Sequence, residues 1–361
     1  MYEPLRATAK KPSRHKSMRF KMRIIVYCLL LLFLVTCKNN SGKTKTERID
    51  YLAQKAFEDK EFIGNILVAD QGEIIYKKSF GSADKENNLQ NSDTTKFLIA
   101  SVSKPITAIL ILRLVDKGIL KLDDTLNKHF TNLDSKLGKI SVHQLLSHTS
   151  GINEVINEEK GMDIKKLLSK ATLGFEPGSG FKYSNSGYVI LKEIAQSVTG
   201  KGYAELVQTE IFDPVGMTSS GVARNSKLDK IAKGYKDASQ TEPAIIDFPL
   251  ENIDGAGSVF STTEDLYKLD RALYLDGLLS ANMKEQMLKQ HIPEEYGYGW
   301  FVRERGGVWD VYCHKGNLAG FASFITRRTQ KNQFIIILSN AENADLSDIE
   351  NGIHKILRTQ D

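Results

Sequence analysis

The sequence reads Ser101-Val102-Ser103-Lys104-Pro105 directly before the apolar run Ile106-Thr107-Ala108-Ile109-Leu110-Ile111-Leu112. We expect a helix that opens at Ser101 and ends near Gly118, a residue type common just after helix C-termini. Positions i and i+3 of a helix share a face, so Ser101 and Lys104 would lie side by side. A serine hydroxyl becomes a good nucleophile when a neighbouring base removes its proton, and a desolvated lysine can be that base. The pair therefore indicates covalent acyl transfer.

The spacing S-x-x-K is weak evidence by itself, because it occurs four times, starting at Ser13, Ser82, Ser101 and Ser179. Ser13 lies in a basic leader, Ser82 in a polar turn and Ser179 in a loop rich in glycine and proline. Only Ser101 opens a long apolar helix. The alternative interpretation of Ser101 is a serine that caps the N-terminus of that helix.

The chain has 361 residues, enough for one large mixed domain. Its formal charge of +5 comes from the N-terminus. Residues 1–36 carry eight basic side chains and one acidic one, or +7, so the remainder carries 5 − 7 = −2. A basic face for nucleic acid is therefore not expected on the rest of the chain.

Residues 1–36 have the organisation of an export signal, with a basic segment before an apolar run over residues 24–35. That run is shorter than the ~20 residues that a membrane-spanning helix needs. Leu34-Val35-Thr36-Cys37 resembles the cleavage box of bacterial lipoproteins. The resemblance implies a lipidated Cys37 and a place in the bacterial cell envelope, facing the periplasm or on the outer membrane. A plain secretory peptide and an uncleaved anchor are the alternatives.

After a polar tether over residues 37–46, residues 47–361 are expected to form one α+β domain. Residues 101–290 are mainly helical, and residues 47–100 and 291–361 are rich in strands. The expected outer elements are helices over residues 47–58 and 344–357, a hairpin over 62–80, and strands over 298–303, 308–314, 319–326 and 333–339. Strands so close in sequence pair antiparallel. The simplest assembly is one antiparallel sheet flanked by N- and C-terminal helices, with an inserted all-helical lobe.

Two further motifs lie downstream of Ser101. Tyr183-Ser184-Asn185 is the only Y-x-N in the chain and follows a turn rich in glycine. A loop tyrosine can relay protons, and an asparagine can both donate to and accept from an amide. His314-Lys315-Gly316 is the only H-x-G and ends an expected strand, where a glycine lets a substrate approach the strand edge. Alone, each motif is better explained by ordinary turn or strand structure.

In this order, S-x-x-K, Y-x-N and H-x-G resemble the serine beta-lactamase and penicillin-binding-protein superfamily, and most closely its class C beta-lactamase-like hydrolases. Residues 143–151, 175–188 and 256–262 also resemble segments of that family. The resemblance covers about residues 47–360. It implies an antiparallel sheet with terminal helices and an all-helical lobe, which agrees with the elements expected above.

The resemblance also implies catalytic roles. Ser101 would attack a carbonyl carbon and form an acyl-enzyme, while Lys104 and Tyr183 would share its proton and pass it to the leaving group. The backbone N–H groups of Ser101 and Asn317 would form the oxyanion hole. One such donor stabilises a transition state by roughly 3–4 kcal/mol.

The substrate-binding roles follow in the same way. Asn185 would hold the amide on the acyl side, and His314 would occupy an electropositive position that orients the tyrosine and the far end of the substrate. Gly316 would allow close approach. Lys315 departs from the small hydroxylic residue that is usual at its position, so it would either bind a substrate carboxylate or turn away and leave that site unfilled.

No metal or cofactor is expected. His143 and His148 do not have the spacing of a zinc-binding helix, and we interpret them as structural. With Cys28 in the leader and Cys37 lipidated, Cys313 has no disulfide partner and is expected to be inert.

The expected function is an exported serine hydrolase that acts on a small-molecule or peptide substrate. Beta-lactams, D-alanyl peptides and small esters suit the same residues, because fold and motifs do not fix the substrate. The alternatives are a pseudoenzyme that binds cell-wall peptide without turnover, and a structural envelope lipoprotein whose motifs are coincidental.

Overall fold

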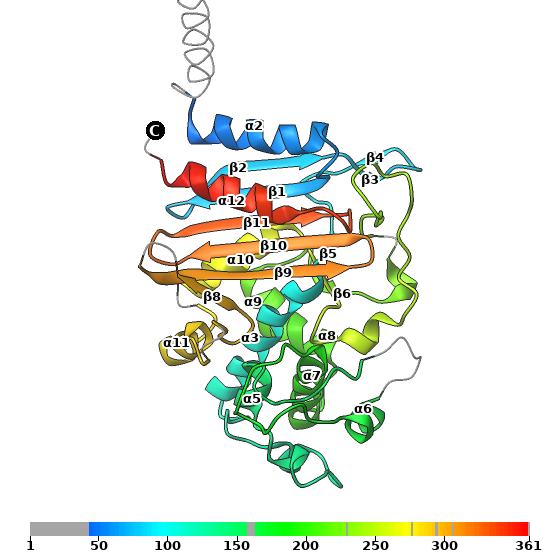
Figure 1. The fold of residues 1–361 in the computed structure, drawn as a ribbon, viewed down its shortest axis with the longest axis vertical. Helices are drawn as coiled ribbons and strands as arrows, with labels where there is room; N and C mark the ends of the chain where they lie inside the picture. Colours follow the sequence, from blue (N-terminus) through cyan, green and yellow to red (C-terminus); the bar gives the residue numbers. More distant parts are fainter. Residues whose placement is uncertain are drawn as a thin grey trace, which may run out of the picture.

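The computed structural model describes residues 43–156, 163–228, 230–275, 277–292, 295–304 and 307–359. Its centre is a six-stranded antiparallel sheet in the order β2-β1-β11-β10-β9-β8 (Figure 1). The strands are β1 (Gly64–Asp70), β2 (Glu73–Phe80), β8 (Phe301–Glu304), β9 (Trp309–Leu318), β10 (Phe321–Arg328) and β11 (Gln333–Ser339). The first and last strands of the chain meet where β1 pairs with β11. One sheet thus holds both ends of the chain, as the sequence predicted.

Both faces of this sheet are covered, because its central strands carry buried apolar side chains on both faces. On β11, Ile335 and Ile337 face one hydrophobic cluster, and Ile336 and Leu338 face another. Successive side chains of a strand point to opposite faces, so these four residues divide between two cores.

The terminal helices α2 (Lys45–Glu58) and α12 (Leu346–Leu357) pack together on one face (Figure 1). Helix α2 begins two residues before the predicted start at residue 47. Thr44 and Glu47 form a reciprocal capping box there, which satisfies backbone N–H groups that a helix start leaves unpaired. Helix α12 begins at Leu346, two residues after the predicted position. The tether expected to run to residue 46 is therefore already helical at Lys45.

The opposite face carries the inserted helical block. Its helices are α3 (Ser103–Asp116), α4 (Leu126–His129), α5 (Val142–Leu146), α6 (Ile164–Lys170), α7 (Asn185–Thr199), α8 (Tyr203–Val207), α9 (Asp213–Val215), α10 (Thr263–Tyr274) and α11 (Ala281–Leu288). Helix α10 packs directly against β11 and β1. The fold is the α+β arrangement that the sequence predicted, an antiparallel sheet flanked by terminal helices with an inserted helical block.

Helix α3 is a central element of this block. Every residue from Ser103 to Leu112 is buried, so the helix has no solvent face over its first ten residues. A helix that is apolar all round belongs in a core. It ends at Asp116, two residues before Gly118, which adopts a left-handed φ of 70°. Among the described residues, no helix has both the length and the apolar character required to cross a membrane.

Two small sheets were not predicted. One pairs β3 (Ser82–Asp84) with β4 (Leu89–Gln90), and the other orders β5 (Phe97–Leu98), β7 (Val259–Ser261) and β6 (Gly221–Val222) as β5-β7-β6. These strands are two or three residues long, too short to show a periodic pattern. The three-stranded sheet holds the chain in place immediately before Ser101, because β5 is one of its strands.

Candidate active site

Ser101 lies in a tight turn between strand β5 and helix α3. The turn is a 3₁₀ helix over Ala100–Val102, and the N–H of Ile99 donates to the carbonyl of Val259. Ala100 has a φ of 46°, a left-handed conformation that is strained for a residue with a side chain. The sequence correctly predicted a helix at this position, although the regular α-helix starts two residues later, at Ser103.

Lys104 lies one turn further, fully buried, with its Nζ atom 3.1 Å from Oγ of Ser101. Nζ also lies 2.7 Å from Oδ1 of Asn185 and 2.9 Å from the carbonyl oxygen of Ala256. Burial disfavours the charged form and lowers the pKa of Lys104 to about 7. A large fraction of this lysine is therefore a neutral amine near pH 7.

The three neighbours orient that amine. A neutral amine has two N–H bonds and one lone pair. The carbonyl oxygens of Ala256 and of the Asn185 side chain can only accept, so they take both hydrogens. The lone pair is left to face the hydroxyl of Ser101.

Tyr183 covers the same pair from the neighbouring loop. Nζ of Lys104 lies 4.7 Å from the centre of its ring, and its phenol hydrogen-bonds with the side chain of Ser101. Burial raises the pKa of Tyr183 well above its usual value, so the phenol keeps its proton at neutral pH. His148 supports this loop from behind: its Nδ1 accepts from the N–H of Ser184, and its ring centre lies 4.4 Å from that of Tyr183. His148 thus has a structural role at the edge of the site.

Asn185 is the first residue of helix α7, whereas the sequence analysis placed its motif in a loop. Ser184 caps this helix by accepting from the N–H of Gly187. The carboxylate of Glu154 accepts from the N–H groups of Asn185 and Ser186, at 2.8 and 3.1 Å, and from the hydroxyl of Ser186. An anion is favourable at this end of a helix.

Sequence analysis missed Glu154 as a site residue. It precedes α7 by about thirty residues, and no motif connects the two segments. Its negative charge acts against the effect of burial and raises the pKa of Lys104. Ala256 was missed as well, because its contribution is a backbone carbonyl, which any residue type can supply.

Strand β9 borders the active site on the side of the central sheet. Strand β8 pairs with it only as far as Cys313, so in the described part of the chain residues 314–318 have no strand partner on that edge. Gly316 passes over the nucleophile: a Cβ there would lie 2.4 Å from the carbonyl oxygen of Ile99 and 2.9 Å from the amide nitrogen of Ser101. Only glycine permits this approach, which brings β9 against the start of the catalytic turn.

His314 is buried beside Tyr183, with 6.1 Å between the ring centres. Its Nδ1 lies 2.7 Å from the carbonyl oxygen of Lys315 and must donate, which leaves Nε2 as an acceptor 3.4 Å from the hydroxyl of Tyr296. Burial lowers the pKa of His314 to about 3. We therefore expect a neutral imidazole at pH 7, so the orienting role predicted for His314 would depend on hydrogen bonding and packing.

Of the two alternatives expected for Lys315, the structure shows the second, because the side chain turns away from the site. Its assignment as a substrate-binding residue is therefore corrected. Lys315 pairs across the sheet with Phe324, whose side chain belongs to the core beneath the terminal helices. Its Nζ atom lies 4.9 Å from the Phe324 ring centre and donates to Oγ of Ser347 on α12, at 2.5 Å. The adjacent Gly316 points to the other face, as strand alternation requires. Lys315 is therefore not a substrate-binding residue.

The side chain of Asn317 also turns away, since its Nδ2 donates to the carbonyl of Glu342. Only its backbone N–H remains a candidate for the oxyanion hole. Cys37, the predicted lipidation site, lies outside the described residues. Within the described ranges, no group of three His, Cys, Asp or Glu side chains is arranged to hold a metal ion.

Comparison with known proteins gives matches over most of the chain. The sequence model of the Beta-lactamase family matches residues 54–357. "Penicillin-binding protein 4*" of Bacillus subtilis is 30% identical over 83% of this chain and 73% of its own length. "Putative penicillin-binding protein PbpX" of the same organism is 31% identical over 90% of this chain and 83% of its own.

Solved structures show the same similarity. A penicillin-binding protein from Bacillus halodurans superposes with a TM-score of 0.74 at 26% identity, covering 84% of this chain and 98% of its own. D-amino acid amidase from Ochrobactrum anthropi reaches a TM-score of 0.74 at 22% identity, over 86% of this chain and 98% of the amidase. At that identity, the likeness to the amidase is one of fold.

Proposed function

The chain belongs to the Beta-lactamase family, and from that premise we propose that it is an exported serine hydrolase that works through an acyl-enzyme on Ser101. The observation that carries the proposal is the environment of Lys104. Its Nζ atom contacts two fixed acceptors and lies 3.1 Å from the serine hydroxyl, so the lone pair of the neutral amine is free to accept the serine proton. A general base has to lie within hydrogen-bonding distance of the proton it removes, with a pKa near the working pH. The amine of Lys104 satisfies both requirements.

In the acylation step, Oγ of Ser101 bonds to the substrate carbonyl carbon and its proton passes to Nζ of Lys104. The bond to the leaving group then breaks, and the leaving group takes up that proton, with the Tyr183 phenol as the relay. Because the phenol stays protonated at neutral pH, we assign it to donation and the amine to proton removal. Water then attacks the ester on Ser101 by the same route and releases the acid.

The oxyanion that forms during acylation would be held by the backbone N–H groups of Ser101 and Asn317. The close approach of Gly316 to the amide nitrogen of Ser101 supports this assignment, because it brings the two segments together. The unpaired edge of β9 would bind the extended backbone of an acyl chain by strand-type hydrogen bonds.

We assign the substrate to the amides, beta-lactams and esters that form a serine acyl-enzyme, with D-alanyl peptides among them. The names of the Bacillus subtilis relatives support beta-lactams as first probes. The unusual Lys315 gave the pseudoenzyme alternative some support, and that side chain lies on the other face of β9. It therefore loses the feature that favoured it.

The test is covalent labelling with a fluorescent penicillin and with an acyl fluorophosphonate, followed by mass spectrometry of the labelled peptide. We expect an adduct on Ser101 in the native chain and none in Ser101→Ala. Ser179→Ala is the matched control, because Ser179 starts another S-x-x-K but lies in an exposed loop. Equal labelling of the native chain and Ser101→Ala would overturn the proposal.

Turnover separates a hydrolase from a binding protein. We expect repeated hydrolysis of a chromogenic beta-lactam or a p-nitrophenyl ester, beyond one equivalent of enzyme. An adduct on Ser101 that persists with no release of acid would instead favour the pseudoenzyme.

Export and lipid anchoring rest on residues 1–37. Metabolic labelling with an alkyne fatty acid should mark the native chain and leave Cys37→Ser unmarked. Labelling of both would remove Cys37 as the attachment site.

A further inference from the structure

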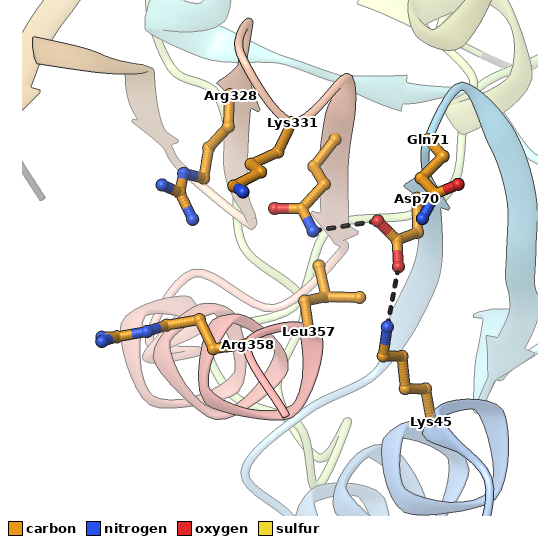
Figure 2. A pocket seen from close by; sticks show the side chains of 8 residues that line it. Lys45, Asp70, Gln71, Arg328, Lys331, Leu357 and Arg358 are labelled. Atoms are coloured by element: carbon orange, nitrogen blue, oxygen red, sulfur yellow. Dashed lines mark hydrogen bonds and ion pairs between the residues drawn. The ribbon is translucent and has the colours of Figure 1, made fainter. Parts of the chain in front are cut away.

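A cavity of about 400 Å³ opens at the end of the central sheet, outside the site described above (Figure 2). It lies where the start of α2, the end of α12 and the turns after β1 and β10 come together. Its lining residues are Lys45, Asp70, Gln71, Arg328, Lys331, Gln333, Leu357 and Arg358. None of them belongs to the catalytic group around Ser101.

The cavity carries a surplus of positive charge. Four of its lining side chains are cationic and only Asp70 is anionic. Lys45 already neutralises Asp70 in an ion pair at 3.2 Å. Figure 2 shows the charged ends of Arg328 and Lys331 close together, whereas the Arg358 side chain extends outward from the end of α12 at the margin of the cavity. This leaves a net charge of about +3 with no carboxylate in the lining to balance it.

Two of these cations have no ion-pair partner in the described part of the chain. Lys331 is exposed in the turn between β10 and β11, and Arg358 is exposed just after α12. Arg328 has only a long contact of 3.6 Å with the buried carboxylate of Asp310, and its Nε atom makes no hydrogen bond. Structural ion pairing therefore does not account for the presence of three cations around this cavity.

Gln333 adds an acceptor to this cationic group. It is 94% buried, directly across the hairpin from Arg328, and its Nε2 donates to Asp70 at 2.9 Å. Its Oε1 accepts no hydrogen bond among the described residues. An unsatisfied buried acceptor is unfavourable, so a ligand that donates a hydroxyl would be stabilised here.

We propose that this cavity binds a glycerophosphate group, with Arg328, Lys331 and Arg358 around the phosphate and Gln333 accepting from a ligand hydroxyl. Arginine and lysine together are suited to phosphate, because guanidinium groups bind two oxygens at once and ammonium groups supply a compact charge. Leu357, which is 5% exposed, supplies an apolar surface for the carbon chain of the ligand.

The position of the cavity favours a membrane phospholipid as the source of this group. Lys45 follows Cys37 by eight positions, so a fully extended chain keeps the cavity within ~28 Å of the proposed lipid anchor. At that distance an anchored chain can bring the cavity to the headgroup layer. The binding chemistry itself does not depend on the anchor, and it is independent of the hydrolase function proposed above.

The test uses the full chain, its K331Q/R358Q variant and a charge-matched control, K121Q/K139Q. Lys331 and Arg358 are chosen because their replacement breaks no ion pair of the described residues. Lys121 and Lys139 are exposed lysines on the helical block, far from the cavity in sequence and on other elements. Calorimetry would measure binding of sn-glycerol 3-phosphate and of dihexanoylphosphatidylglycerol below its micelle concentration. Flotation would measure binding to phosphatidylcholine vesicles with increasing phosphatidylglycerol.

We expect K331Q/R358Q to weaken binding of both soluble probes by about tenfold or more, because two charge-assisted contacts are lost, and K121Q/K139Q to bind like the native chain. The dependence of flotation on phosphatidylglycerol should fall in K331Q/R358Q only, since the basic leader contributes equally to all three proteins. If K331Q/R358Q loses binding of the soluble probes but floats like the native chain, the cavity binds a glycerophosphate group that does not come from a membrane phospholipid. Equal binding by all three proteins, or no binding by the native chain, would overturn the proposal. Labelling of Ser101 should be the same in all three, which separates this test from that of the hydrolase.

Discussion

Asn185 accepts a hydrogen bond from Lys104 at 2.7 Å, although the two residues are 81 positions apart in the sequence. The contact joins the first turn of α7 to the first turn of α3. It holds one hydrogen of the amine away from Ser101, and the carbonyl of Ala256 holds the other. The helical block thereby sets the direction in which the base acts.

Replacing Lys104 with alanine should abolish acylation while leaving binding intact. The amine is the only base within hydrogen-bonding distance of Ser101 Oγ in the described residues, so we expect the acylation rate to fall by about three to six orders of magnitude, as when a triad residue is removed. Stopped-flow acylation, with the dissociation constant measured separately, checks this. A variant that is acylated at close to the native rate would exclude Lys104 as the base.

The pH profile should follow the deprotonation of Lys104. The amine must be neutral to accept a proton, and burial lowers its pKa to about 7. We therefore expect kcat/KM to rise with pH, with a midpoint near 7, and to level off above it. A profile that is flat from pH 5.5 to 8.5 would contradict this assignment.

Replacing Glu154 with glutamine should move that midpoint to lower pH. The Glu154 carboxylate raises the pKa of Lys104, so its removal lowers that pKa and increases the neutral fraction at pH 6. The glutamine oxygen can still accept from the start of α7. Glu205→Gln, which removes an exposed carboxylate whose ion pair among the described residues is with Lys201, should leave the midpoint unchanged. A midpoint of the kcat/KM profile that moves to higher pH in Glu154→Gln would contradict this role of the carboxylate.

A methyl group at Gly316 should damage acylation more than folding. It would lie 2.4 Å from the Ile99 carbonyl oxygen and must displace either β9 or the turn that holds Ser101. Because displacements of about 1 Å cost around a hundredfold in rate, we expect a loss of that size in Gly316→Ala. Gly202→Ala is the control, since a Cβ there meets nothing within 4 Å. Labelling kinetics and a thermal melt would be compared, and native kinetics in Gly316→Ala would refute the close approach.

Replacing Lys315 with threonine should leave substrate preference unchanged. The lysine contacts Phe324 and Ser347 on the far face of β9. We expect KM values for substrates with and without a free carboxylate to stay within about twofold of native, because surface substitutions have small effects. A selective change for the carboxylate-bearing substrates would place Lys315 in the site after all.

The sequence predicted the elements whose pattern is long and regular. The apolar run after Lys104 identified α3, and the apolar segments near both termini identified the sheet and its terminal helices. The predicted ends differed by one to four residues where capping or pairing, rather than hydrophobicity, sets the boundary, as at Thr44 and Ser184.

The rest of the site depends on contacts between distant segments. Glu154 carries no motif, and Ala256 contributes only a backbone carbonyl, so their roles exist only once α7 and α3 are packed. The neutral state of His314 follows from burial, which the residue type alone does not reveal. The orientation of Lys315, by contrast, was available from strand alternation, since it lies between His314 and Gly316.

The contact of Gly316 with the turn at Ser101 is made by main chain alone. Side chains elsewhere around the site can then change in size and polarity without moving the nucleophile relative to β9. For protein engineering, this separates two tasks: new substrates can be sought by altering the surrounding side chains, while the acylating apparatus is carried over unaltered.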